Sequence, residues 1–187
     1  MAGAAIKGKK RWVQIIGPAF FNNAILGESY VFEPSSIIGK TIYAHLSYLT
    51  GDMRKQYIVL GFKVTSVKGS DAYADLISYS LVLAHVKRMV RPNKDKIDDS
   101  FTVETKDHLA LRIKPVILTR NKAHNSLLTK IRKHVRDSFI ALSRNHSFPE
   151  LVDGLISGHI SKELKQQINK IYPINTFEVR SLELIRR

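Results

Sequence analysis

Residues 101–142 read FTVETKDHLALRIKPVILTRNKAHNSLLTKIRKHVRDSFIAL, and this stretch decides the fold class. The runs at 101–105 and 109–118 alternate between apolar and polar residues, which predicts two strands joined by a turn at 106–108. From residue 125 to residue 142 apolar side chains return every three or four positions, which predicts an amphipathic basic helix. A hairpin followed by such a helix indicates an α+β fold.

The residues before this stretch predict mainly strands. Residues 11–17 form a strand-like run, and residues 36–67 hold short runs rich in β-branched and aromatic residues. The turn signal at 50–52 predicts a hairpin within the second region. Between Asp75 and Val90 apolar residues recur at helical spacing, which predicts a helix, and the polar residues 92–99 are expected to form a linker.

The residues after 142 predict two more helices and a final strand. Ser147 and Glu150 have the spacing of a capping box, and the helix that they begin is expected to end near Gly158. Ser161 is expected to cap the next helix, and residues 174–184 alternate as a strand. We therefore expect a β-barrel-like core of mostly antiparallel strands with flanking helices.

Length and composition favour one folded domain with a short arm. The chain has 187 residues, of which 44% are hydrophobic and 25% charged, so a disordered, fibrous or coiled-coil chain is disfavoured. Residues 1–10 are small or basic and lack apolar periodicity. We expect them to form a flexible basic arm, followed by a single domain over residues 11–187.

The charge of the chain points to a polyanionic partner. Thirty Lys and Arg residues against 16 Asp and Glu residues give a net charge of +14. Residues 87–136 alone hold 14 basic and five acidic residues, a net charge of +9, and the resulting repulsion would be relieved by nucleic acid. The candidate RNA-binding residues are the cations of the arm and of this window: Lys7, Lys9, Lys10, Arg11, Lys87, Arg88, Arg91, Lys94, Lys96, Lys106, Arg112, Lys114, Arg120, Lys122, Lys130, Arg132 and Lys133.

Two sets of side chains allow a more specific prediction. Arg112 and Lys114 alternate with aliphatic residues, so both are expected on one face of the sheet, where phosphates could bind. The aromatic residues in strand-like runs are expected to pack in the core or across strands. Trp12 adjoins three basic residues, and stacking on an unpaired base is the alternative for its ring.

Motifs for catalysis, metal binding or export are absent from the sequence. It has no cysteine, no histidine pair at metal-ligand spacing, and no phosphate-binding or nucleophile motif. No segment reads as a secretory signal or is long enough to span a membrane. We expect an intracellular protein with no cofactor, no metal and no membrane partner.

Several strings, taken in order, resemble one family. These are LVLAHVKRMVR (81–91), KDKIDD (94–99), VETKD (103–107), LRIK (111–114), ILTRNKAHNSLLTKIRK (117–133) and KIYPINTFEVRSLELI (170–185). The series is similar to the S-three-a-e, or S-one-e, family of small-ribosomal-subunit proteins shared by archaea and eukaryotes. One departure is His108, which stands where that family usually has glycine in the hairpin turn.

The resemblance implies a function and a set of partners. It implies a non-enzymatic protein that binds small-subunit rRNA on the platform, near the rRNA 3′ end and the mRNA exit, in cytoplasmic ribosomes. Neighbouring small-subunit proteins, with mRNA near the exit, are the other expected partners. The resemblance also implies rRNA contacts at nine of the basic residues named above: Lys87, Arg88, Arg91, Lys106, Arg112, Lys114, Lys130, Arg132 and Lys133. Two alternatives stay open: an RNA-processing enzyme, for which a catalytic cluster is missing, and a free-standing RNA chaperone.

Overall fold

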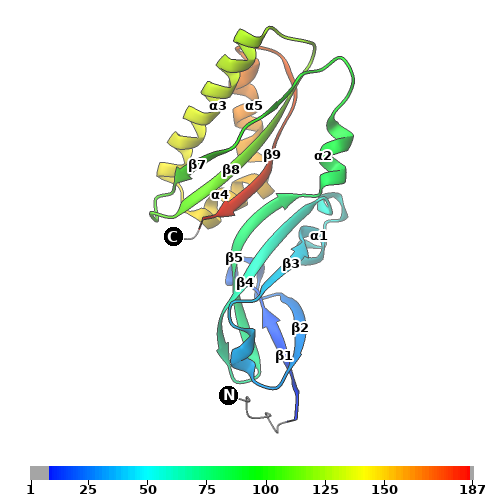
Figure 1. Cartoon of the computed structure of the whole chain (residues 1–187), viewed down its shortest axis with the longest axis vertical. Coiled ribbons are helices and arrows are strands. Elements are labelled where there is room, and N and C mark those ends of the chain that lie inside the picture. Colours follow the sequence, from blue (N-terminus) through cyan, green and yellow to red (C-terminus); the bar gives the residue numbers. More distant parts are fainter. Residues whose placement is uncertain (1–8, 186–187) are drawn as a thin grey trace, which may run out of the picture. The chain divides into compact units, whose positions relative to one another are not determined.

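The computed structural model of the chain describes residues 9–185, which divide into two compact units after Ile77 (Figure 1). The first unit contains β1 (Arg11–Ile16), β2 (Ile25–Val31), β3 (Thr41–His45), α1 (Leu46–Thr50), β4 (Ile58–Lys68) and most of β5 (Asp71–Leu81). The second unit contains α2 (Leu83–Met89), β6 (Lys96–Asp98), β7 (Phe101–Glu104), β8 (Ala110–Thr119), α3 (Asn125–Asn145), α4 (Phe148–Ile156), α5 (His159–Asn169) and β9 (Ile174–Leu184).

The first unit is a five-stranded sheet with the order β2-β1-β5-β4-β3. The pairs β1 with β2 and β3 with β4 are antiparallel, whereas β1 and β5 run parallel where Gln14 lies opposite Asp71. Alternate residues of β1 point into the core, where Val13 is completely buried and Phe21 contacts Phe62 edge to face with 5.8 Å between ring centroids. This alternation follows from the two-residue period of a strand.

The second unit is built around β8. This strand pairs antiparallel with β9 along one side, and with β6 and β7 along the other. The last residues of β5, from Ser78 to Ser80, pair antiparallel with β9. The mixed, mostly antiparallel architecture with flanking helices confirms the predicted fold class. A closed barrel is not formed by the described residues, because β2 and β3 remain unpaired with each other at the two ends of the first unit's sheet.

Helices α3 and α5 pack against the sheet of the second unit, as Figure 1 shows. The ring of Phe139 on α3 contacts the rings of one residue on each of two strands. Its centroid lies 5.9 Å from that of Phe101 on β7 and 6.2 Å from that of Phe177 on β9. Ile131 and Val135 lie on the same side of α3 and are buried as well. The apolar stripe read from the sequence is therefore the side of α3 that meets the sheet.

Truncating this stripe should destabilise the protein. Ile131 is 0% exposed, so Ile131→Ala removes buried carbon atoms and leaves a cavity. We expect the free energy of unfolding to fall by about 2–5 kcal/mol. Urea unfolding followed by circular dichroism measures the change. A loss below about 0.5 kcal/mol, the value typical of surface substitutions, would show that Ile131 does not belong to the core.

Several predicted elements are confirmed. The hairpin at residues 101–119 forms β7 and β8, residues 125–142 lie in α3, and residues 174–184 form β9. The capping box begins α4: the Ser147 backbone N–H donates to Glu150 Oε2 at 2.8 Å. This hydrogen bond is the main reason why the pKa of Glu150 is lowered.

The predicted helix at 75–90 is wrong over its first half. β5 continues to Leu81, and α2 occupies only residues 83–89. The apolar residues of this segment fit the two-residue period of a strand as well as the period of a helix, because Tyr79 and Leu81 are buried two positions apart in β5. Pairing of β5 with β9 decides between them, and this long-range contact has no signal in the local sequence.

Three smaller predictions also need correction. β3 and β4 pair as the expected hairpin does, but α1 and a 3-10 turn at Met53–Lys55 connect them in place of a tight turn at 50–52. α5 begins at His159 after Gly158, whose φ of +77° suits glycine, and Ser161 is therefore inside the helix instead of capping it. The expected linker at 92–99 contains the short strand β6.

Glu178 provides a pH-dependent prediction. Burial raises the pKa of this β9 carboxyl above its usual value, while Lys165 partly opposes the shift. Because the folded state binds this proton more tightly than the unfolded state does, protonation of Glu178 stabilises the fold. This stabilisation is complete below the pKa of Glu178 in the unfolded state and is lost as pH rises through its pKa in the folded state. We expect Glu178→Gln to raise the melting temperature at pH 7 and to leave it nearly unchanged below about pH 4. If the variant and the parent protein had the same melting temperature at pH 7 as well as below about pH 4, the raised pKa of Glu178 would be contradicted.

Candidate nucleic-acid interface

The outward side of α3 carries exposed cations. Lys130 and Lys133 are exposed on the side of the helix away from the buried Ile131, and Arg132 is exposed on its flank. Among the described residues, none of these three side chains forms an ion pair. Their charges are therefore available to a ligand.

Arg136, on the same helix, has a structural partner. Its guanidinium group donates to both carboxylate oxygens of Asp99, at 3.0 and 3.2 Å, and lies over the Phe101 ring. These two charge-assisted hydrogen bonds, both donated by Nη2, fix the loop before β7 against α3. Asp99 thus compensates the charge of Arg136, whereas Lys130, Arg132 and Lys133 have no such acidic partner among the described residues.

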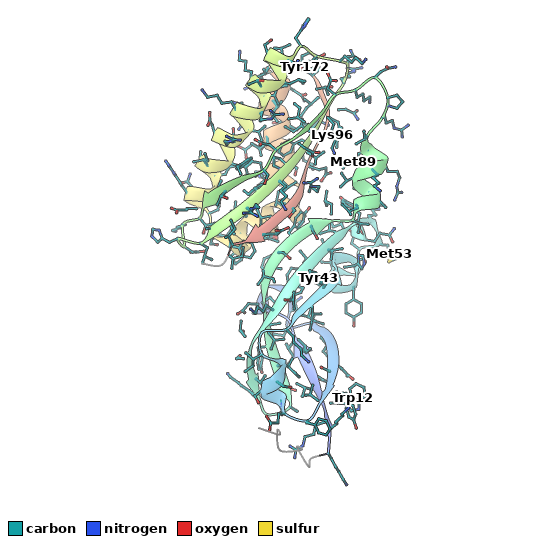
Figure 2. The ribbon with its side chains drawn as sticks, in the orientation of Figure 1. Trp12, Tyr43, Met53, Met89, Lys96 and Tyr172 are labelled. Carbon is teal, nitrogen blue, oxygen red and sulfur yellow. The ribbon has the colours of Figure 1, made fainter. Side chains whose placement is uncertain are left out.

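A second group of cations, the basic loops, is formed by Lys94, Lys96, Arg120 and Lys122. Asp95 holds the two loops together: its carboxylate accepts from the Ala123 backbone N–H at 2.7 Å, and its backbone bonds to Thr119. On the other side Tyr172 Oη donates to the Lys122 carbonyl at 3.1 Å. Figure 2 labels Lys96 and Tyr172 in this part of the second unit. Two chain segments that are 24 residues apart at Asp95 and Thr119 thus present their cations together.

Lys96 is the member of the basic loops with a compensating acid, because its ammonium group pairs with Asp98. No other member forms an ion pair among the described residues. Arg120 and Lys122 are exposed, and Lys94 is half-buried.

Arg112 and Lys114 lie on one face of β8, as predicted, while Leu111 and Ile113 are buried on the other. The pairing register also brings Glu183 of β9 opposite Arg112, and its carboxylate lies 3.6 Å from Lys114 Nζ. This acid offsets part of the positive charge on the face. Arg112 is exposed and Lys114 only half-buried, so Arg112 is the better placed of the two for a phosphate.

The turn between β7 and β8 presents Lys106. Its backbone N–H donates to the carbonyls of Ser143 and His146 at the end of α3, which fixes the turn against the helix. His108 has a φ of +57°, in the left-handed region where glycine is least strained. His108 stands where the family that the sequence resembles usually has glycine, and its backbone has a conformation that glycine also adopts.

Lys87 and Arg88 lie on α2 and Arg91 lies two residues after its end, and all three are exposed. Burial, and then the neighbouring Arg88, lower the pKa of His85 on the same helix. At neutral pH the charge of α2 therefore resides on Lys87 and Arg88.

The first unit carries the remaining candidates. Lys7 and most of the predicted arm lie outside the described residues, whereas Lys9, Lys10 and Arg11 are exposed. Trp12 packs across strands against Tyr30, as one of the two alternatives predicted, but the pair lies on the outer face of β1 and β2. The sequence alone did not indicate that Tyr30 lies opposite Trp12, although the alternation of Tyr30 and Phe32 places both on one face of their strand-like run.

The described residues contain no group of three His, Asp or Glu side chains that could hold a metal ion. In the part of the chain that the structure covers, none of the helices is both long and apolar enough to cross a membrane.

These features define a class: small basic α+β proteins in which most exposed cations of the described residues lack compensating acids. The sequence profile of the Ribosomal S3Ae family matches residues 7–187, and the chain belongs to this family. Its members are structural ribosomal proteins and not enzymes, which confirms the family resemblance and the non-enzymatic prediction. The chain is thus a structural component associated with the small ribosomal subunit.

Curated relatives carry the same assignment. The chain is similar to small ribosomal subunit protein eS1 of Nanoarchaeum equitans, with 34% identity over 94% of this chain and 89% of the relative. The eS1 protein of Halorubrum lacusprofundi is 34% identical over 96% of this chain and 83% of the relative. That of Sulfurisphaera tokodaii is 32% identical over 97% of this chain and 96% of the relative.

Proposed function

We propose that this chain binds small-subunit rRNA and stabilises its fold through the cations of the second unit. Most of the predicted RNA-binding residues in this unit are exposed and have no ion-pair partner among the described residues; this is the observation that carries the proposal. Cations without compensating acids repel one another, and rRNA phosphates would relieve that repulsion.

The two best-defined groups differ in what they offer. On α3, Lys130, Arg132 and Lys133 stand on a rigid helix whose opposite side is anchored in the core, so their spacing is fixed before binding. The basic loops are held by the hydrogen bonds of Asp95 and Tyr172. Arrays positioned in this way can bind phosphates of RNA segments that lie close together and keep them in register.

Family membership supports a proposal for the location of the chain within the subunit. We propose the platform, near the rRNA 3′ end and the mRNA exit, in cytoplasmic ribosomes, with neighbouring small-subunit proteins and mRNA as further contacts. Phosphate contacts by Lys and Arg carry little base information, so this function requires RNA shape more than RNA sequence.

Sedimentation of the tagged chain through a sucrose gradient tests the proposal. The chain should migrate with the small subunit and remain there in moderate salt. A chain that stays at the top of the gradient while remodelling RNA would instead be a free chaperone. Turnover of RNA by the purified chain, abolished by substitution of an acidic or histidine residue, would show an enzyme and would also overturn the proposal.

A further inference from the structure

A row of exposed aromatic rings lies on the outer face of β1 and β2. Trp12 is 63% exposed, Tyr30 is 50% exposed and Phe32 is 44% exposed. Trp12 and Tyr30 are directly opposite each other in the antiparallel pair, with 4.8 Å between ring centroids and 36° between ring planes. Figure 2 shows the Trp12 side chain on the outside of β1.

A lysine completes this row. Lys10 Nζ lies 5.1 Å from the centroid of Phe32 and 5.6 Å from that of Tyr30, within the range of cation–π contacts. Lys9 and Arg11, next to it in the chain, are exposed. We call Lys10, Trp12, Tyr30 and Phe32 the aromatic row.

The core of the first unit does not need these rings. On the opposite face of the same two strands, Val13 and Ile15 are buried and supply the apolar contacts. A sheet face that is open to solvent normally carries polar side chains at alternate positions. Three aromatic side chains there leave apolar area in water, which is typical of a surface that contacts a partner.

The chemistry of the aromatic row fits unpaired nucleotides. Every base has a π face that can stack on an aromatic ring whatever its identity, and each base brings a phosphate. Lys10 places a cation beside the rings, where the phosphate of a stacked nucleotide would need one. Exposed Glu28 lies opposite Gln14, at the end of the row away from Lys10, which favours entry of the RNA backbone from the side of Lys9, Lys10 and Arg11.

We propose that Trp12, Tyr30 and Phe32 form a stacking site for unpaired bases of single-stranded RNA, with Lys10 binding an adjacent phosphate. The site uses none of the second-unit residues that carry the proposed rRNA contacts. It adds recognition of unstacked bases to a protein whose proposed second-unit contacts are to phosphates.

Trp12 is the single tryptophan of the chain, so its fluorescence reports on this site alone. We expect titration of the full chain with single-stranded oligouridylate to quench the emission strongly. A base-paired RNA of the same length should quench it much less, because its bases are already stacked. Quenching that is equal for both RNAs, or absent while the oligouridylate binds, would overturn the proposal.

Substitutions separate stacking from folding. Loss of one base–aromatic stack corresponds to about 1–3 kcal/mol, so Trp12→Leu and Tyr30→Leu should each weaken oligouridylate binding by about 5- to 140-fold. Trp12→Phe, which keeps an aromatic ring, should retain most of the affinity. Tyr43→Leu is the matched control, because Tyr43 is 66% exposed on β3 of the same unit and lies outside the aromatic row. Melting temperatures of all variants show whether they fold.

The same variants distinguish this proposal from the proposed rRNA function. If Trp12→Leu binds oligouridylate like the parent, the stacking site is wrong even where charge reversal on α3 abolishes rRNA binding. If Trp12→Leu fails only to join the small subunit and binds RNA normally, the row contacts a protein and the proposal is overturned. In a variant with Lys130, Arg132 and Lys133 of α3 replaced by glutamate, oligouridylate should still quench Trp12 fluorescence. That result would support the stacking site whether or not this variant binds rRNA.

Discussion

Replacing Lys130, Arg132 and Lys133 together with glutamate is expected to lower the affinity for naked small-subunit rRNA by about 100-fold or more. The expected loss follows from about 1 kcal/mol for each exposed charge contact, to which repulsion by the new carboxylates adds. The fold should survive, because exposed substitutions away from special features usually change stability within about 0.5 kcal/mol. Filter binding at low salt and circular dichroism melts measure the two effects.

A matched control removes the influence of net charge. Reversal of Lys40, Arg54 and Lys162 changes the net charge by the same amount at exposed residues outside the candidate set. This control should lose much less affinity than the α3 variant. Equal losses would show that rRNA responds only to the overall field of the protein, and unchanged binding by the α3 variant would remove α3 from the interface.

The second large effect concerns salt. If about six to ten phosphates are neutralised, affinity for rRNA should fall by roughly 10³- to 10⁵-fold between about 50 and 200 mM salt, with a linear plot of log K against log salt. The slope should be shallower in the α3 variant by about three, because each lost phosphate contact removes about one unit. A flat salt response of the parent protein would contradict an electrostatic interface.

The elements that the sequence predicted well are those held by local signals. The capping box at Ser147, the apolar stripe through Ile131 and the hairpin turn at 106–108 each depend on neighbours within a few residues. These signals were strong enough to predict α3, α4, β7 and β8. The same local information placed Ile131 in the core and Lys130 on the surface.

The errors lie where long-range contacts decide. Residues 75–81 fit a helix and a strand equally well by local pattern, and pairing of Ser78–Ser80 with Ser181–Glu183 of β9 favours the strand. The strand β6 exists because residues 96–98 pair with β8, and no local signal marks them. The missing closure of the sheet is of the same kind, since it depends on which strand ends meet.

The candidate site could be predicted as a list of charges but not as an arrangement. Counting cations could not show that Arg136 is bound by Asp99, or that Glu183 faces Lys114. It also could not show that Asp95 joins the loops carrying Lys94 and Lys122. Each of these contacts joins residues far apart in the chain, which composition and periodicity do not describe.

An electron cryomicroscopy map of the small ribosomal subunit containing this chain can show whether α3 and the basic loops bind rRNA. We expect Lys130, Lys133 and the cations of the basic loops within about 3 Å of rRNA phosphate oxygens, the distance of charge-assisted hydrogen bonds. A map in which these side chains face solvent or another protein, while rRNA contacts a different surface, would contradict this expectation.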